Sequence, residues 1–290
     1  MIPASFDYHA PGSLPEALAL LTKYGDEAKV LSGGQSLLPL LKLRLGQTGH
    51  LIDIGRIPGL EYVKEEGGML RIGGRTRESA LEGSEVIRSR YPILHDTAKV
   101  IADPIVRNMA TVGGNLAHGD PGNDHPATML ALGAQVVATG PKGERVIPID
   151  QFFLGLFRTA LKADEVLTEI RIPVPPARSG GAYVKLERKV GDYATAAAAA
   201  QVTLDGKGAV AKVGLALTNV GPTPIRAADA EKFLVGKSPD AATLGEAAQR
   251  AAKASSPSAD RRGSVEYKRD MARVLAGRAL KSAVERAGGR

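Results

Sequence analysis

Two short segments of the sequence pair adjacent glycines with small polar side chains. They are Ser32-Gly33-Gly34-Gln35-Ser36 and Thr111-Val112-Gly113-Gly114-Asn115. Adjacent glycines let the backbone adopt positive φ and approach a ligand closely, so that successive N–H groups can converge on an anion. The hydroxyl and amide side chains add neutral donors for phosphate oxygens. Each segment therefore indicates a phosphate-binding site, with an ordinary turn as the alternative.

The surroundings of the first segment favour a nucleotide-type ligand. An apolar stretch at 29–31 predicts a strand before it, and the leucines at 37–43 predict a helix after it, whose N-terminus favours a pyrophosphate. Neither segment matches the G-x-G-x-x-G or G-x-x-x-x-G-K-[ST] pattern, which excludes ordinary Rossmann and P-loop sites. Two similar segments far apart in the chain predict one dinucleotide held between two subdomains.

The segment 117–126 concentrates titratable side chains. It holds His118, Asp120, Asp124 and His125, and such groups suit Mg, Mn or Zn. The spacing is not H-E-x-x-H, and the interspersed Gly and Pro predict a loop whose side chains hold backbone or ribityl-like hydroxyl groups. The scattered histidines define no Ser–His–Asp arrangement. We predict neither a catalytic residue nor a metal ligand in this chain.

Composition excludes several classes of function. The chain has no Cys, which excludes disulfides, a thiolate nucleophile and Cys-ligated zinc or iron–sulfur clusters on this polypeptide. The net charge of +7 is mostly C-terminal, because residues 226–290 hold 14 Lys and Arg against 8 Asp and Glu. The chain has no Trp and only 4% aromatic residues, so few side chains are available to stack on nucleic-acid bases. We therefore predict no nucleic-acid partner. The basic segment is then a solvated or partner-facing helical surface.

Length and patterning outline the elements that must position these residues. A chain of 290 residues predicts two domains or one large composite. A capping box at Ser13 and Glu16 predicts a first helix, and hairpins are predicted around Glu66-Gly67-Gly68 and Asp205-Gly206-Lys207-Gly208. Pro175-Pro176 with Ser179-Gly180-Gly181 predicts a linker, and the stretch from 227 onward predicts helices.

Two further features bear on conformation and location. The run Ala196–Ala200 is open between a helix, by propensity, and a strand, by its position beside Val202-Thr203-Leu204. The sequence shows neither a basic and apolar leader nor an uninterrupted apolar run of 18 residues, so we expect a cytoplasmic chain.

Three motifs taken together resemble the FAD-binding medium subunits of the molybdenum hydroxylases. They are Ser32–Pro39, Arg107–Asn115 and His118–Asp124, and Leu186–Ala194 is similar to the C-terminal domain of that family. The resemblance covers nearly the whole chain and is strongest to the branch that oxidises carbon monoxide. Flavin subunits that act with aldehyde- or aromatic-oxidising partners remain an alternative. A stand-alone flavin oxidase of the PCMH type and a non-catalytic nucleotide-binding or assembly module remain open as well.

The resemblance implies an α+β fold. Two α+β subdomains of the PCMH type, expected at residues 1–57 and 58–176, would clasp FAD between them. A C-terminal domain, expected at 177–290, would add a three-stranded antiparallel sheet with a helical bundle. In this fold Ala196–Ala200 is a strand.

The resemblance also implies roles for single residues. Both glycine segments would hold the pyrophosphate of FAD, and Asp124 would bond the ribityl chain or a nearby hydroxyl. Leu161 would lie near the flavin ring, and Tyr193 would cover one ring face. A tyrosine suits that place because its flat apolar body can shield the ring while its hydroxyl finds a polar partner.

Partners follow from the same resemblance. FAD would be the cofactor of this chain, with [2Fe–2S] clusters on a small subunit and the molybdenum cofactor on a large subunit. Electrons would pass through the flavin to an external acceptor such as a quinone. The implied assembly is a dimer of heterotrimers, and a peripheral membrane association would arise through a partner.

Overall fold

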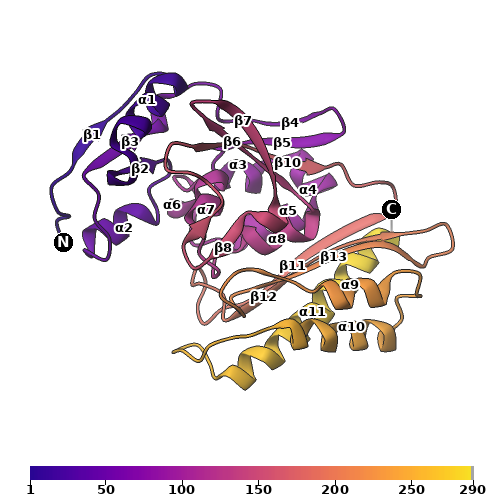
Figure 1. Cartoon of the computed structure of the whole chain (residues 1–290). Helices are drawn as coiled ribbons and strands as arrows, with labels where there is room; N and C mark the ends of the chain where they lie inside the picture. Colours follow the sequence, from indigo (N-terminus) through magenta and orange to yellow (C-terminus); the bar gives the residue numbers. More distant parts are fainter. Residues whose placement is uncertain (289–290) are drawn as a thin grey trace.

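The computed structural model describes residues 1–288, and three principal sheets follow one another along the chain (Figure 1). The first sheet is parallel, in the order β1 (Asp7–His9), β3 (His50–Asp53) and β2 (Ala28–Leu31). Helices α1 (Leu14–Tyr24) and α2 (Leu37–Lys42) accompany it. The buried face of α1, formed by Ala17, Leu18 and Leu21, packs with Ile52 of β3, which fixes this unit around its own small core.

The first helix starts at the predicted cap with one difference. The Ser13 hydroxyl accepts from the Glu16 N–H at 3.4 Å, as a capping box requires. The Glu16 carboxylate accepts from the N–H of Gly12 at 2.9 Å, and not from that of Ser13. The box is therefore shifted outward by one residue, and the helix start is satisfied all the same.

The middle sheet is antiparallel and contains five strands. In spatial order they are β4 (Val63–Glu66), β5 (Met69–Gly73), β10 (Val166–Pro173), β6 (Gln135–Gly140) and β7 (Gly143–Pro148). The helices of this part are α3 (Glu78–Gly83), α4 (Glu85–Arg90), α5 (Pro92–Val100), α6 (Pro104–Arg107), α7 (Val112–His118) and α8 (His125–Leu132). A small pair, β8 (Phe153–Gly155) and β9 (Arg158–Thr159), precedes β10. The predicted hairpin around Gly67 and Gly68 is confirmed, with both glycines at positive φ.

The C-terminal sheet has one strand more than expected. Its antiparallel strands are β11 (Ser179–Leu186), β12 (Ala196–Leu204), β13 (Val210–Thr218) and the two-residue β14 (Ile225–Arg226). Helices α9 (Ala228–Leu234), α10 (Ala241–Ala254) and α11 (Val265–Gly288) cover it from below in Figure 1. The short β14 was not expected, because two residues between turns carry no periodic signal. The α+β fold class itself is confirmed.

The alanine run is a strand because it lies between two layers. Alternate residues face opposite ways: Ala197 and Ala199 join the core shared with the middle sheet, while Ala196, Ala198 and Ala200 join the core under the helices. All five are fully buried. Small side chains let both layers approach the strand closely, which overrides the helix propensity of alanine.

The predicted linker is partly wrong. Pro175 and Pro176 do lie between β10 and β11, but Ser179, Gly180 and Gly181 belong to β11 itself. A Cβ on Gly180 would lie 2.3 Å from the carbonyl oxygen of Ala283 in α11. This glycine therefore marks a close approach of helix and strand, and not a flexible connection. Within residues 1–288, no helix is long and apolar enough to cross a membrane.

Candidate functional site

A cavity of about 1010 Å³ is lined by residues from all three parts of the fold. Twelve of the thirteen predicted site residues line it: Ser32, Gly33, Gly34, Gln35, Ser36, Thr111, Gly113, Gly114, Asn115, Asp124, Leu161 and Tyr193. Val112 does not, because its side chain is buried in the core and its N–H donates to the carbonyl of Thr76 at 2.9 Å. The fold thus brings both glycine segments to one cavity.

The first glycine segment is an open loop between β2 and α2. Among the residues that the structure describes, the N–H groups of Gly33, Gly34, Gln35 and Ser36 have no acceptor. Gly34 takes the left-handed conformation, with φ of 75°, which only glycine adopts at little cost. Four successive amides without partners beside a cavity form the donor set that a phosphate requires.

The second glycine segment differs from the first in the partners of its backbone amides. Thr111 is the N-cap of α7, and its hydroxyl accepts from the Gly114 N–H at 3.2 Å. The N–H of Gly113 donates to the carbonyl of Gly74, and that of Asn115 donates to the carbonyl of Thr111. These amides are already paired within the chain. This segment can therefore offer side chains to a ligand, but no cradle of backbone N–H groups.

One glycine of each segment serves close packing of the backbone. A Cβ on Gly113 would lie 2.4 Å from the carbonyl oxygen of Gly74, and one on Gly33 would lie 2.3 Å from that of Met109. The hydroxyls of Ser32 and Thr111 are hydrogen-bonded at 2.9 Å. The two segments are therefore docked against each other, and a ligand held by the first loop also contacts the wall formed by the second.

The chemistry of this wall fits the diphosphate of FAD. Donors are unpaired amides and neutral hydroxyls, and the cavity volume lies at the upper end of the range for small-molecule sites. The Asn115 side-chain oxygen is buried without a partner among the described residues. A bound hydroxyl, or a phosphate oxygen if the amide is turned, would satisfy that side chain.

Leu161 and Tyr193 also line the cavity. Leu161 follows β9, and its N–H lies 3.4 Å from the Thr159 hydroxyl. The Tyr193 side chain is 44% exposed and lies against Gly122, where a Cβ would approach its ring to 3.1 Å. The roles of both residues beside a flavin ring stay predictions.

Asp124 is more enclosed than expected. One carboxylate oxygen accepts from the Tyr183 hydroxyl at 2.6 Å, and the other accepts from Lys185 Nζ at 2.9 Å. Burial raises the pKa of Asp124, and its charged partners only partly oppose this. Both oxygens are thus engaged within the chain, so a bond to the ligand would come in addition to these two.

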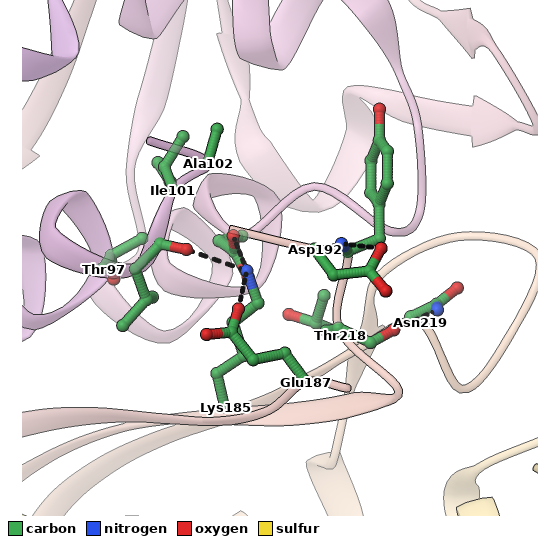
Figure 2. A network of polar contacts seen from close by, with 12 residues as sticks. Thr97, Ile101, Ala102, Lys185, Glu187, Asp192, Thr218 and Asn219 are labelled. Atoms are coloured by element: carbon green, nitrogen blue, oxygen red, sulfur yellow. Dashed lines mark hydrogen bonds and ion pairs between the residues drawn. The ribbon is translucent and has the colours of Figure 1, made fainter. Parts of the chain in front are cut away.

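Sequence reasoning missed Lys185. This lysine is buried, lines the cavity, and also contacts the carbonyl of Val100 at 2.9 Å and Glu187 at 3.4 Å (Figure 2). A signal was present, because Tyr183 and Lys185 alternate on β11 and must share the face that packs on the middle sheet. A lysine on such a face indicates a paired, functional charge.

The two histidines near Asp124 have separate surroundings. His125 is fully buried and hydrogen-bonded to Glu78 at 2.6 Å, so it is a core residue. His118 ends α7, lines the cavity and packs against Phe157, with ring centroids 5.0 Å apart. Burial lowers the pKa of His118, while nearby Asp120 opposes the shift. At neutral pH this wall of the cavity is therefore uncharged at His118.

Comparison with known proteins decides the family. Residues 4–175 match the family described as "FAD binding domain in molybdopterin dehydrogenase", and residues 181–283 match "CO dehydrogenase flavoprotein C-terminal domain". The chain belongs to the FAD-binding subunits of the molybdenum hydroxylases. It is 47% identical, over 99% of both chains, to the carbon monoxide dehydrogenase medium chain of Afipia carboxidovorans.

Solved structures of this flavin-subunit family agree. A carbon monoxide dehydrogenase from Hydrogenophaga pseudoflava that lacks the Mo-pyranopterin moiety superposes with a TM-score of 0.96 at 49% identity, over 99% of both chains. Quinoline 2-oxidoreductase from Pseudomonas putida 86 superposes with a TM-score of 0.92 at 32% identity, again over 99% of both chains. The predicted family and the FAD cofactor are confirmed, and the relatives are parts of molybdenum-containing oxidoreductases.

Proposed function

We propose that this chain is the flavin subunit of a molybdenum hydroxylase that oxidises carbon monoxide. The observation that carries this is the single cavity that is lined by the Gly33–Ser36 loop and also by Leu161 and Tyr193. The high identity to a carbon monoxide dehydrogenase medium chain, over nearly the full length, supports the choice of substrate. Oxidation of carbon monoxide by water to carbon dioxide releases two electrons and two protons, which would leave the complex on a quinone or another external acceptor.

The residues of this chain bind, orient and shield. FAD, when bound, can take up electrons singly and release them as a pair. We propose that the amides of Gly33, Gly34, Gln35 and Ser36 bind the diphosphate, with the side chains of Ser32, Thr111 and Asn115 completing that wall. Gly113 and Gly114 form part of the same wall, Asp124 lies by the ribityl chain, and Leu161 and Tyr193 enclose the ring. Val112 supports α7 from the core.

The division into domains is part of the proposal. We propose boundaries at 57/58 and 176/177. The three sheets support them, because residues 7–53, 63–173 and 179–226 each contain one principal sheet. Two family matches that meet between residues 175 and 181 support the second boundary as well.

The partners are proposed from the relatives. A small subunit with [2Fe–2S] clusters and a large subunit with the molybdenum cofactor would assemble with this chain as a dimer of heterotrimers in the cytoplasm. The absence of Cys fits this arrangement, because the clusters then need ligands from another polypeptide. A membrane contact would come through a partner.

Purification of the chain together with its associated subunits tests the proposal. We expect yellow protein with about one FAD per chain, whose flavin absorbance bleaches when carbon monoxide is supplied without air. Bleaching by an aldehyde or an aromatic heterocycle, and not by carbon monoxide, would favour the second candidate function, which the likeness to quinoline 2-oxidoreductase supports. Turnover of an organic donor by the isolated chain would favour a stand-alone oxidase. A folded, colourless chain that refuses added FAD would contradict all three.

A further inference from the structure

The loop that carries Tyr193 connects β11 to β12 and lines the cavity through Gly191, Asp192 and Tyr193. On one side Gly191, with φ of 85°, lies so close to Ala102 that a Cβ would approach its carbonyl oxygen to 3.0 Å. On the other side Asn219 Nδ2 donates to the carbonyl of Ala194 at 2.5 Å. The loop is therefore held at both ends. What fixes its middle, where Tyr193 lies, is a separate contact from the C-terminal helical unit.

That contact comes from Arg262, in the turn before α11. Its Nη2 donates to Asp192 Oδ1 at 2.6 Å, and the same carboxylate oxygen accepts from the Tyr193 N–H at 2.8 Å. The guanidinium carbon lies 5.9 Å from the centre of the Tyr193 ring, within cation–π range. Arg262 thus reaches both the backbone and the ring of Tyr193. The hydrogen bond from Arg262 holds the pKa of Asp192 below its ordinary value, so the pair stays charged at neutral pH.

The turn that presents Arg262 is itself anchored in the core. The Arg262 N–H donates to Asp260 Oδ1 at 2.7 Å, and the other oxygen of Asp260 pairs with Lys268 Nζ at 2.8 Å. Lys268 is on α11, is 2% exposed, and also donates to the carbonyl of Ser258. A buried lysine must keep its charge paired and hydrogen-bonded, so Lys268 holds Asp260 and the carbonyl of Ser258 in place. Because Asp260 also accepts from the Arg262 N–H, the position of Arg262 is fixed as well.

A second, small cavity lies beside Tyr193 and Arg262. It has a volume of about 210 Å³ and is lined by Asp120, Gly122, Tyr193, Asn219, Asp260 and Arg262. Tyr193 and Gly122 line both cavities, so the tyrosine lies where the two adjoin. The small cavity offers space into which the ring can turn, and Arg262 forms part of its wall.

We propose that Arg262 is a positioning residue that, through Asp192, keeps Tyr193 closed over the flavin end of the main cavity. The inference rests on the proposed function, because it takes that cavity to hold FAD. The inference extends the proposed function, because it assigns control of flavin exposure to the turn at 258–264 and to Lys268, which anchors that turn on α11. Without Arg262, the loop at 189–195 opens and the flavin becomes more accessible to solvent and to oxygen.

The test compares Arg262→Gln with Arg262→Lys and with the control Arg261→Gln in the full complex. Arg261 is exposed and makes no ion pair or side-chain hydrogen bond among residues 1–288, so its change should leave all readouts as in the parent. We expect Arg262→Gln to raise flavin fluorescence, because a stacked tyrosine quenches it. FAD release should accelerate about tenfold, the equivalent of one charge-assisted hydrogen bond. Arg262→Lys should restore much of both.

Hydrogen exchange separates this inference from the proposed function. Amides of residues 189–195 should exchange faster in Arg262→Gln than in the parent, whether or not flavin is bound. A parent chain without flavin would overturn the proposed function, while faster exchange would still support the bracing of the loop by Arg262. Unchanged exchange in Arg262→Gln would overturn the inference. A flavin-loaded complex with unchanged fluorescence and FAD release in that variant would do so too.

Discussion

The two glycine segments look alike in sequence and differ in the fold. Gly33–Ser36 is a loop whose amides have no acceptor within residues 1–288, while Thr111–Asn115 begins a helix in which the amides of Val112 to Asn115 are all paired inside the chain. The first can bind an anion through its backbone. The second positions the first, since the Ser32 and Thr111 hydroxyls meet at 2.9 Å. A glycine pair therefore indicates a close approach to the backbone. Whether the approaching group is a ligand or another part of the protein depends on whether the glycine amides already have acceptors within the chain.

The largest effect should come from the second segment, at Gly113→Ala. A Cβ there would lie 2.4 Å from the carbonyl oxygen and 2.8 Å from the Cα of Gly74, which is backbone and cannot move aside. We expect a loss of about 3 kcal/mol in the free energy of unfolding, measured by thermal or denaturant unfolding. Gly46→Ala is the control, because no atom lies within 4 Å of its added Cβ. Equal stability of the two variants would contradict the packing role.

The substitution Gly114→Val should produce the next largest effect, and it should weaken ligand binding more than folding. Its Cβ would lie 2.7 Å from the Thr111 hydroxyl, a side chain that can rotate, and 3.8 Å from Ser32 Cβ. The displaced hydroxyl and the added methyl groups then occupy the cavity wall. We expect the ratio of flavin to protein to fall at least about tenfold while most of the fold persists. Gly245→Val, in open space on α10, is the matched control and should keep its flavin.

A smaller effect tests the first segment, at Gly34→Ala. Because φ is 75° at this position, an alanine is strained by about 1 kcal/mol. Gly59, with φ of 76° and open surroundings, provides a control with the same backbone strain. Gly34→Ala should lose somewhat more stability than Gly59→Ala, because its Cβ would also lie 3.0 Å from Leu38 Cδ1. Only Gly34→Ala should weaken FAD binding, by about fivefold in titration. Weakening by both, or by neither, would remove the distinction between the two segments.

The smallest expected effect is on the pH dependence of stability, through His118 at the end of α7. Burial lowers the pKa of His118, so the unfolded chain binds a proton at a pH where the folded chain does not. The stability that this neutral histidine contributes is present above its ordinary value near 6.5 and is lost as the pH falls through the folded value. We expect unfolding experiments between about pH 7 and pH 5 to show this decline, and His118→Gln to flatten it. A parallel decline in that variant would assign the effect to other groups.

Much of the fold and of the chemistry is encoded locally. Turn residues at Gly67-Gly68 and Asp205–Gly208, the cap at Ser13 and the alternation of apolar residues each predict their element correctly. The motifs around Gly33, Gly113 and Asp124 predict FAD and the family. These features depend on short-range dihedral preferences and on hydrogen bonds between near neighbours, which a pattern of residues can express.

The tertiary structure alone decides which polar groups are left for a ligand and which are used by the fold. The amides of Val112 and Gly113 find acceptors at Thr76 and Gly74, and Lys185 pairs with Asp124 across 61 positions of the chain. Ala196–Ala200 is a strand because layers from two distant parts pack on its faces. Arg262 reaches Asp192 from 70 positions away. The partners in such contacts carry no local signal, because they lie far apart in the sequence. Their free energy arises only when the fold removes remote backbone groups and buried charges from water together.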